Sequence, residues 1–127
     1  MVRLVYVIMY TPELLEHFQN PRNVGELDEN AVRVEVSNPA CGDIMRLAAR
    51  FREGVVEEVK FKVRGCTASI AAGSVLTEMM AGRSRDGLAA IRAADIDEVL
   101  GGLAPASKHA AVLCVDAVKR LLAAHSG

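Results

Sequence analysis

The chain has 127 residues, 51% of them hydrophobic but only 4% aromatic, with no tryptophan. Its 15 basic and 16 acidic residues nearly cancel, so nucleic acid is not expected as the main partner. Three cysteines, an odd number, with no secretory signal argue against a disulfide framework. We therefore expect free thiols, a reducing compartment and a cytoplasmic location. The apolar start, Val2 to Ile8, is interrupted by Arg3 and is too short to span a bilayer.

A chain of this length is expected to form a single domain over residues 1–127, because two halves would be too small for good cores. Two interpretations of residues 1–8 stay open. If translation begins at Met9, they are an extension. Otherwise they form an edge strand or a disordered tail.

The first predicted element is a short helix. Thr11 is a suitable N-cap, Pro12 suits the first helical position, and Asn20-Pro21 ends the helical pattern. Residues 21–30 are then loop-like, with several turn formers.

Three segments that follow alternate apolar and charged residues with the period of two that strands require. They run from Val32 to Val36, from Met45 to Arg52 and from Val59 to Arg64. Glu53-Gly54 predicts a tight turn between the last two. One apolar and one charged face per strand indicates an antiparallel sheet with one face in water.

Beyond the third strand the apolar period becomes helical. Residues 67–81 predict a helix of small residues that ends at Gly82, and shorter helices are expected at 85–93 and 95–100. A last helix is expected from about residue 107 to 124. Strands followed by helices predict an α+β fold, a three-stranded antiparallel sheet with helices packed on one face.

Metal-binding side chains lie in three distant stretches, Cys41-Gly42-Asp43, Gly65-Cys66 and His109. Two thiolates, a carboxylate and an imidazole form a complete ligand set for a soft or borderline metal. In an up-down-up meander, the loop after the first strand and the end of the third lie at one end of the sheet. Cys66 also precedes a predicted helix, whose N-terminus favours thiolate. If the last helix starts at the same end, His109 completes the site.

Other reactive side chains have simpler interpretations. Cys114 lies mid-helix among apolar residues and is expected to be buried. His17 and His125 are expected to be solvated. The charged face of the sheet is expected to be solvated too, with the docking of an acidic partner as the alternative. Its basic members are Arg46, Arg50, Arg52, Lys60, Lys62 and Arg64.

From Met9 onward the chain resembles the IscU/NifU-type iron–sulfur cluster assembly scaffolds. The segment Asn20-Pro21-Arg22-Asn23-Val24-Gly25 resembles the family's N-terminal signature. Asn38-Pro39-Ala40-Cys41-Gly42-Asp43 resembles its first ligand loop, and Phe61 to Cys66 with Ala68-Ser69-Ile70-Ala71 resembles its second. Thr77-Glu78, Gly82, Leu113 and Asp116-Ala117-Val118-Lys119 continue the match.

The resemblance implies a scaffold rather than an enzyme. Such a protein accepts sulfur from a cysteine desulfurase, binds iron, assembles a 2Fe–2S cluster and hands it to apo-proteins. By position, Cys41 and Cys66 would be cluster and sulfur ligands, Asp43 the labile ligand and His109 an alternative ligand. Zinc binds at the same site in many members. A homo-oligomer is compatible with this interpretation.

Two departures from the family pattern keep other hypotheses open. Ala110 stands where the family usually has a third cysteine, and Cys114 lies about 6 Å further along the helix axis. The segment from Leu103 to Ser107 resembles the chaperone-recognition motif only loosely, so a dedicated Hsp70 partner is not expected. The alternatives are a zinc-bound sulfur acceptor for a desulfurase, and a degenerate relative that acts as a metal-binding regulator.

Overall fold

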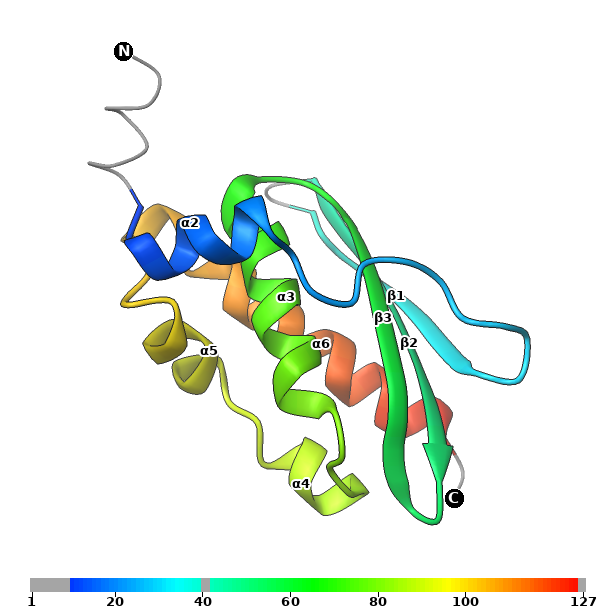
Figure 1. Ribbon diagram of the computed structural model, residues 1–127. Coiled ribbons are helices and arrows are strands. Elements are labelled where there is room, and N and C mark those ends of the chain that lie inside the picture. Colours follow the sequence, from blue (N-terminus) through cyan, green and yellow to red (C-terminus); the bar gives the residue numbers. More distant parts are fainter. Residues whose placement is uncertain (1–9, 40–41, 126–127) are drawn as a thin grey trace.

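The computed structural model describes residues 10–39 and 42–125, and it has the predicted α+β architecture. Strands β1 (Val32–Asn38), β2 (Asp43–Arg52) and β3 (Val55–Arg64) form an antiparallel sheet in the order β1-β2-β3. The helices gather on one face of this sheet (Figure 1). The predicted fold class is confirmed, and the three strand segments are found with slightly wider bounds.

The turn between β2 and β3 is formed by Glu53 and Gly54, as predicted. Both residues have positive φ, 53° and 82°. Two consecutive residues with left-handed backbone angles form a two-residue hairpin turn. The twist of such a turn matches that of the flanking strands. The apolar side chains of β2 and β3 therefore stay in register on the helical side, apart from one shift between Arg50 and Phe51.

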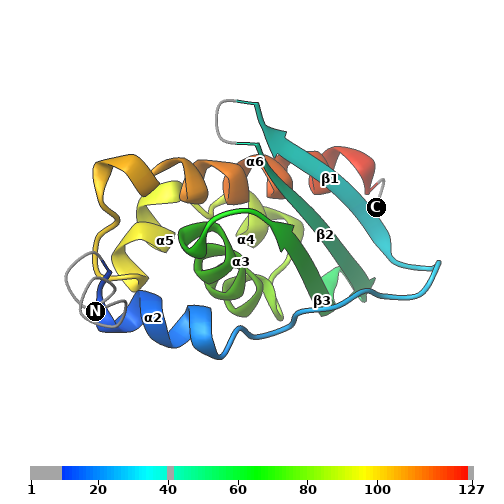
Figure 2. The same cartoon turned by 90° about the horizontal axis from the view of Figure 1, so that it is seen from above.

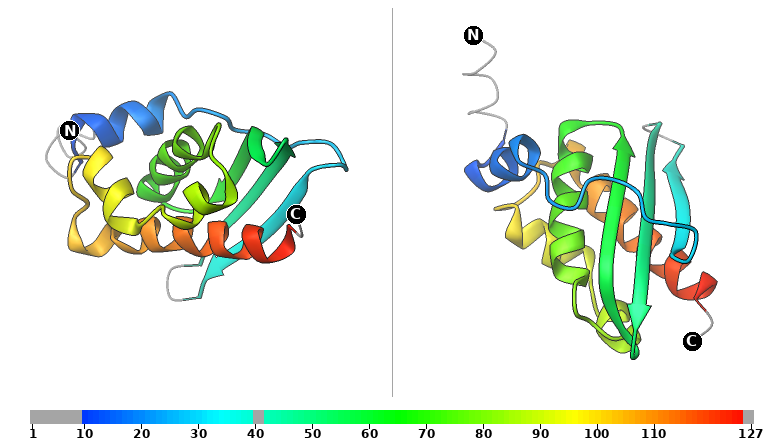
Figure 3. Two further views of the ribbon diagram at one scale, coloured as in Figure 1. Left: turned by 90° about the horizontal axis from the view of Figure 1, so that it is seen from below. Right: turned by 45° about the vertical axis from the view of Figure 1, so that its right-hand side comes forward.

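Five α-helices and one 3-10 turn occur in the described residues. Their bounds are α2 (Pro12–Gln19), α3 (Thr67–Met80), α4 (Arg85–Ala89), α5 (Ala93–Val99), η1 (Pro105–Ser107) and α6 (His109–Ala124). None is long and apolar enough to cross a membrane. Helix α3 lies between α2 and α6, as Figures 2 and 3 show from opposite sides (Figure 2; Figure 3). Most of its residues are buried, so it packs against the fold on most of its sides rather than along one stripe.

The short helices α4 and α5 differ from their predicted bounds because of their caps. The Ser84 hydroxyl accepts a hydrogen bond from Gly87 N, which begins α4, but that helix ends at Ala89 rather than at residue 93. The carboxylate of Asp95 reaches back to Arg92 N at 2.9 Å. This one-sided cap, from the third helical residue back to the N-cap, begins α5 two residues earlier than predicted.

The outer face of the sheet is charged, as predicted, and many of its cations have carboxylate partners. Arg46 pairs with Glu35 at 2.9 Å, and Arg50 contacts Asp28 and Glu58. Arg52 and Lys62 also have acidic neighbours. These side chains are largely exposed, so each pair adds little stability. The pairing fits a solvated face.

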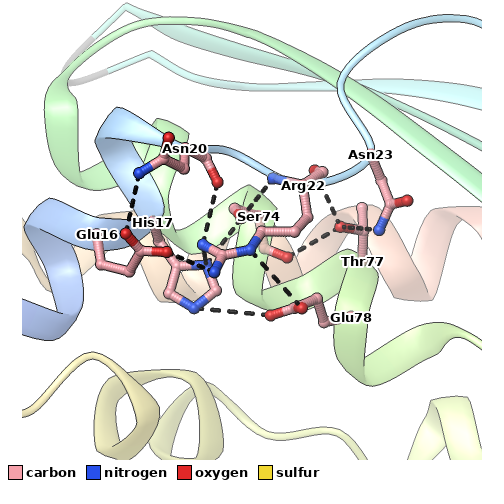
Figure 4. A network of polar contacts seen from close by, with 8 residues as sticks. All are labelled: Glu16, His17, Asn20, Arg22, Asn23, Ser74, Thr77 and Glu78. Atoms are coloured by element: carbon pink, nitrogen blue, oxygen red, sulfur yellow. Dashed lines mark hydrogen bonds and ion pairs between the residues drawn. The ribbon is translucent and has the colours of Figure 1, made fainter.

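His17 is not solvated, and this prediction was wrong. The residue is only 8% exposed, because α2 packs it against α3. Its Nδ1 lies 2.8 Å from the Ser74 hydroxyl and 3.4 Å from Arg22 Nη1. Figure 4 shows these contacts within a larger polar network that also includes Glu16 and Glu78 (Figure 4). The network joins α2 and the following loop to α3.

The burial of His17 predicts a loss of stability in mild acid. Desolvation, followed by the nearby Arg22 guanidinium, lowers the pKa of His17 below its usual 6.5, although Glu78 and Glu16 oppose this. The unfolded chain therefore binds a proton more readily than the folded chain. Stability should be complete above about pH 6.5 and fall as the pH drops below it. Urea unfolding between pH 5 and 7.5 measures this, and His17→Gln should have a flatter pH profile. Parallel profiles for the two proteins would refute the assignment.

His125 is also more enclosed than predicted. Its ring stacks on Phe51, with centroids 3.8 Å apart and an angle of 15° between the planes. Arg85 lies 3.0 Å from its Nδ1 and donates to the carbonyls of Leu122 and His125. Free carbonyls at the C-terminus of α6 are thus satisfied by a cation from α4.

Candidate metal centre

Cys66 occupies the connection between β3 and α3. It is the N-cap of α3 and has extended backbone angles, with φ −77° and ψ 166°. No side chain caps the first turn there, and Ser69 N and Ile70 N both bond to the Cys66 carbonyl. The thiol is half-buried. It therefore lies at the N-terminus of α3, where the first-turn N–H groups of the helix gather.

Asp43 reaches the same place from the start of β2. It pairs with Asn38 across the β1–β2 hairpin and is only 4% exposed. Its carboxylate packs directly over Gly65, where a β-carbon would lie 2.6 Å from Asp43 Cγ and Oδ1. Any larger residue than glycine would collide with the carboxylate. Gly65 thus has a steric role.

His109 is the first residue of α6 and completes the group. Its Nε2 lies 3.3 Å from Asp43 Oδ2 and 3.7 Å from Cys66 Sγ. Cys66 Sγ is 3.4 Å from the same carboxylate oxygen. One ligand atom from each of the three residues lies within 4.8 Å of the others. The strands and helices therefore converge at one end of the sheet (Figure 1).

The electrostatics of the group favour an ionised carboxylate. Burial alone would raise the pKa of Asp43, but hydrogen bonds from Ser69, Cys66 and His109 outweigh it and lower that pKa below its ordinary value. A carboxylate, a thiol and an imidazole at these distances fit Zn²⁺ or iron, which accept oxygen, sulfur and nitrogen donors together. The donor set suits a borderline metal better than Mg²⁺ or Ca²⁺.

The structure brings together three of the four predicted ligands. Asp43, Cys66 and His109 meet, while Cys41 lies outside the described residues. Their role as ligands remains a prediction. Cys114 is not part of the group: it is fully buried, as predicted, and burial raises the pKa of its thiol. Ala110, at the position of the absent third thiol, is fully buried in the core.

Ser69 is a polar neighbour of the group that was not among the predicted ligands. Its hydroxyl donates to Asp43 Oδ2 at 2.5 Å and lies 3.3 Å from Cys66 Sγ. The sequence places it in the first turn of α3, three residues after Cys66. At that spacing a side chain lies close to the N-cap residue. The spacing could therefore have indicated from sequence that Ser69 lies beside Cys66.

A three-stranded meander that gathers a thiol, a carboxylate and an imidazole at one end defines a small α+β domain with a candidate metal site. Residues 9–127 match the NifU-like N terminal domain family, and the chain belongs to that family. The resemblance found in the sequence is thereby confirmed.

Two relatives and one solved structure illustrate the similarity. The iron–sulfur cluster assembly scaffold protein IscU of Escherichia coli is 41% identical over 118 residues, which cover 90% of this chain and 91% of that protein. IscU 1 of Archaeoglobus fulgidus is 37% identical over 114 residues, 90% of this chain and 74% of that protein. The crystal structure of an iron–sulfur cluster assembly scaffold protein for the SUF system from Fervidobacterium islandicum AW-1 superposes with a TM-score of 0.76. At 20% identity, covering 91% of this chain and 97% of that one, it supports the fold.

Proposed function

We propose that the chain is a scaffold on which an iron–sulfur cluster is assembled and from which it is passed on. The observation that carries the proposal is the convergence of Asp43, Cys66 and His109 in a chain of the NifU-like family. The cluster is a cargo, so no substrate is turned over and the chain is not an enzyme. A 2Fe–2S cluster is the proposed cargo, with Cys41 as the fourth ligand.

The three described ligands are suited to temporary binding. Cys66 supplies a thiolate, the donor that iron–sulfur clusters use most. Asp43 and His109 supply an oxygen and a nitrogen, which bind a soft metal less tightly than sulfur does. The side chain of His109 is 21% exposed and that of Asp43 only 5%, so the site is open on the side of the imidazole. We therefore propose that a cargo enters and leaves on this side.

The partners follow from this role. We propose a cysteine desulfurase as the sulfur donor, which would place its sulfur on Cys41 or Cys66, and apo iron–sulfur proteins as recipients. A cytoplasmic location suits free thiols. Zinc binding at the same residues is part of the proposal, because the donor set also satisfies a tetrahedral zinc ion.

Anaerobic reconstitution with ferric iron and sulfide tests the proposal. The loaded protein should show visible sulfur-to-iron charge-transfer absorption, equal amounts of iron and acid-labile sulfide, and a Mössbauer spectrum of a 2Fe–2S centre. Incubation with an apo-ferredoxin should then move the absorption to the recipient.

A matched control is the same reconstitution with excess Zn²⁺ present. If zinc occupies the site of Asp43, Cys66 and His109, it should reduce cluster formation. Absence of iron and sulfide uptake when no zinc is added, by a protein that binds zinc tightly, would contradict the cargo proposal and favour a zinc-bound sulfur acceptor.

A further inference from the structure

Ser69 is a polar residue at the candidate metal centre that is not one of the proposed ligands. It is the third residue of α3 and is fully buried. Its hydroxyl lies between two proposed ligands, 2.5 Å from Asp43 Oδ2 and 3.3 Å from Cys66 Sγ. A buried hydroxyl is retained at such a place only when it is hydrogen-bonded.

The carboxylate oxygen Oδ2 of Asp43 receives contacts from three groups. Besides Ser69, they are Cys66 Sγ at 3.4 Å and His109 Nε2 at 3.3 Å. Metal binding would change the last two, because a cysteine must lose its proton and an imidazole must present a lone pair to the ion. The serine hydroxyl takes part in neither change. Its hydrogen bond to Asp43 can therefore persist with and without the cargo.

The carboxylate is confined on its other side as well. Asp43 Cγ and Oδ1 lie 2.6 Å from where a β-carbon of residue 65 would be, so the Gly65 backbone packs against one side of the group. Ser69 holds Oδ2 on the side that faces Cys66 and His109. An ionised carboxylate oxygen can accept more than one bond, so Oδ2 keeps capacity for a metal while bonded to Ser69.

We propose that Ser69 is a positioning residue that orients Asp43 Oδ2 toward Cys66 and His109 and so determines how tightly the centre holds its metal. This inference rests on the proposed function of the site. A hydrogen-bond partner of a ligating carboxylate fixes its orientation, and loss of such a partner typically lowers metal affinity about 10–100-fold.

Cobalt titration of the anaerobic, metal-free protein tests the role of Ser69. Co²⁺ substitutes for zinc and reports its ligands by thiolate charge-transfer and ligand-field absorption. Ser69→Ala should keep the charge-transfer band, because Cys66 still binds, but shift the ligand-field bands and weaken binding by about 10–100-fold. Ser69→Thr, which retains a hydroxyl, should bind within about threefold of the native protein, well inside that range.

The matched control is Ser74→Ala on the same helix. Ser74 is also fully buried, but its hydroxyl bonds to His17 and to Arg22 N rather than to a ligand. This variant should lose stability in urea and keep native cobalt affinity and bands.

The outcomes separate the inference from the proposed function. If the native protein gives no thiolate charge-transfer band, the metal site itself is wrong and so is the role of Ser69. If the native protein binds Co²⁺ and Ser69→Ala binds equally well with unchanged ligand-field bands, only the role of Ser69 is overturned. Equal weakening by Ser69→Ala and Ser74→Ala would also overturn it, since that would be a general effect of stability.

Discussion

Replacement of Cys66 with alanine is expected to reduce metal affinity by more than about 100-fold and to abolish cluster assembly. Loss of an outer partner of a ligand already costs about 10–100-fold, and Cys66 is a direct sulfur donor. Its thiol is the only one in the described part of the chain that lies within reach of Asp43 and His109. Isothermal titration with Zn²⁺ and anaerobic reconstitution measure the two effects.

Cys114→Ala is the matched control, because it removes one thiol from the same chain. Cys114 is fully buried in α6, away from the centre. Its loss should cost about 1 kcal/mol of stability through a small cavity and leave zinc affinity native. If both variants lost zinc equally, the thiol of Cys66 would have no special place in the centre. If neither did, the assignment of Cys66 as a ligand would be wrong.

Much of the candidate site was predictable because its position follows from topology. The alternation of apolar and charged residues in the three strands defines a meander. In a meander the start of β2 and the end of β3 lie together, which brings Asp43 to Cys66. The helical period after Cys66 places that residue at an N-terminus. Only the approach of His109 required an assumption, namely that α6 begins at the same end.

The residues that were missed have partners too distant in sequence for any local pattern to indicate. His17 looks like a polar residue on an exposed helix, and its burial depends on Ser74, 57 residues away. The ring of His125 stacks on Phe51, from another element of the fold. In both cases the docking of a helix determines the environment of the imidazole. Ser69 differs in part, because its spacing from Cys66 was a local signal, but its contact with Asp43 also depends on a residue 26 positions away.

The close approach of α3 to β3 is a second feature, and disturbing it is expected to reduce the stability of the protein strongly. Gly73 on α3 faces Phe61 on β3, and a β-carbon at residue 73 would lie 2.4 Å from Phe61 Cε2. Phe61 is only 2% exposed and belongs to the core, so its ring has little room to move. This contact determines the separation of the two elements that Cys66 connects.

Gly73→Ala is therefore expected to destabilise the metal-free protein by about 1–3 kcal/mol through overpacking, despite the better helix propensity of alanine. Phe61→Leu makes room for the added methyl group, so the double variant should lose less stability than the sum of the two single variants. Gly87→Ala is the control, because its new β-carbon would lie 3.2 Å from Arg83 Cβ, a tight contact rather than the 2.4 Å overlap at residue 73, and should change stability much less. Urea unfolding followed by circular dichroism measures all four variants. Simple additivity of Gly73→Ala and Phe61→Leu would show that the two residues are not coupled, and that the spacing of α3 and β3 is fixed elsewhere.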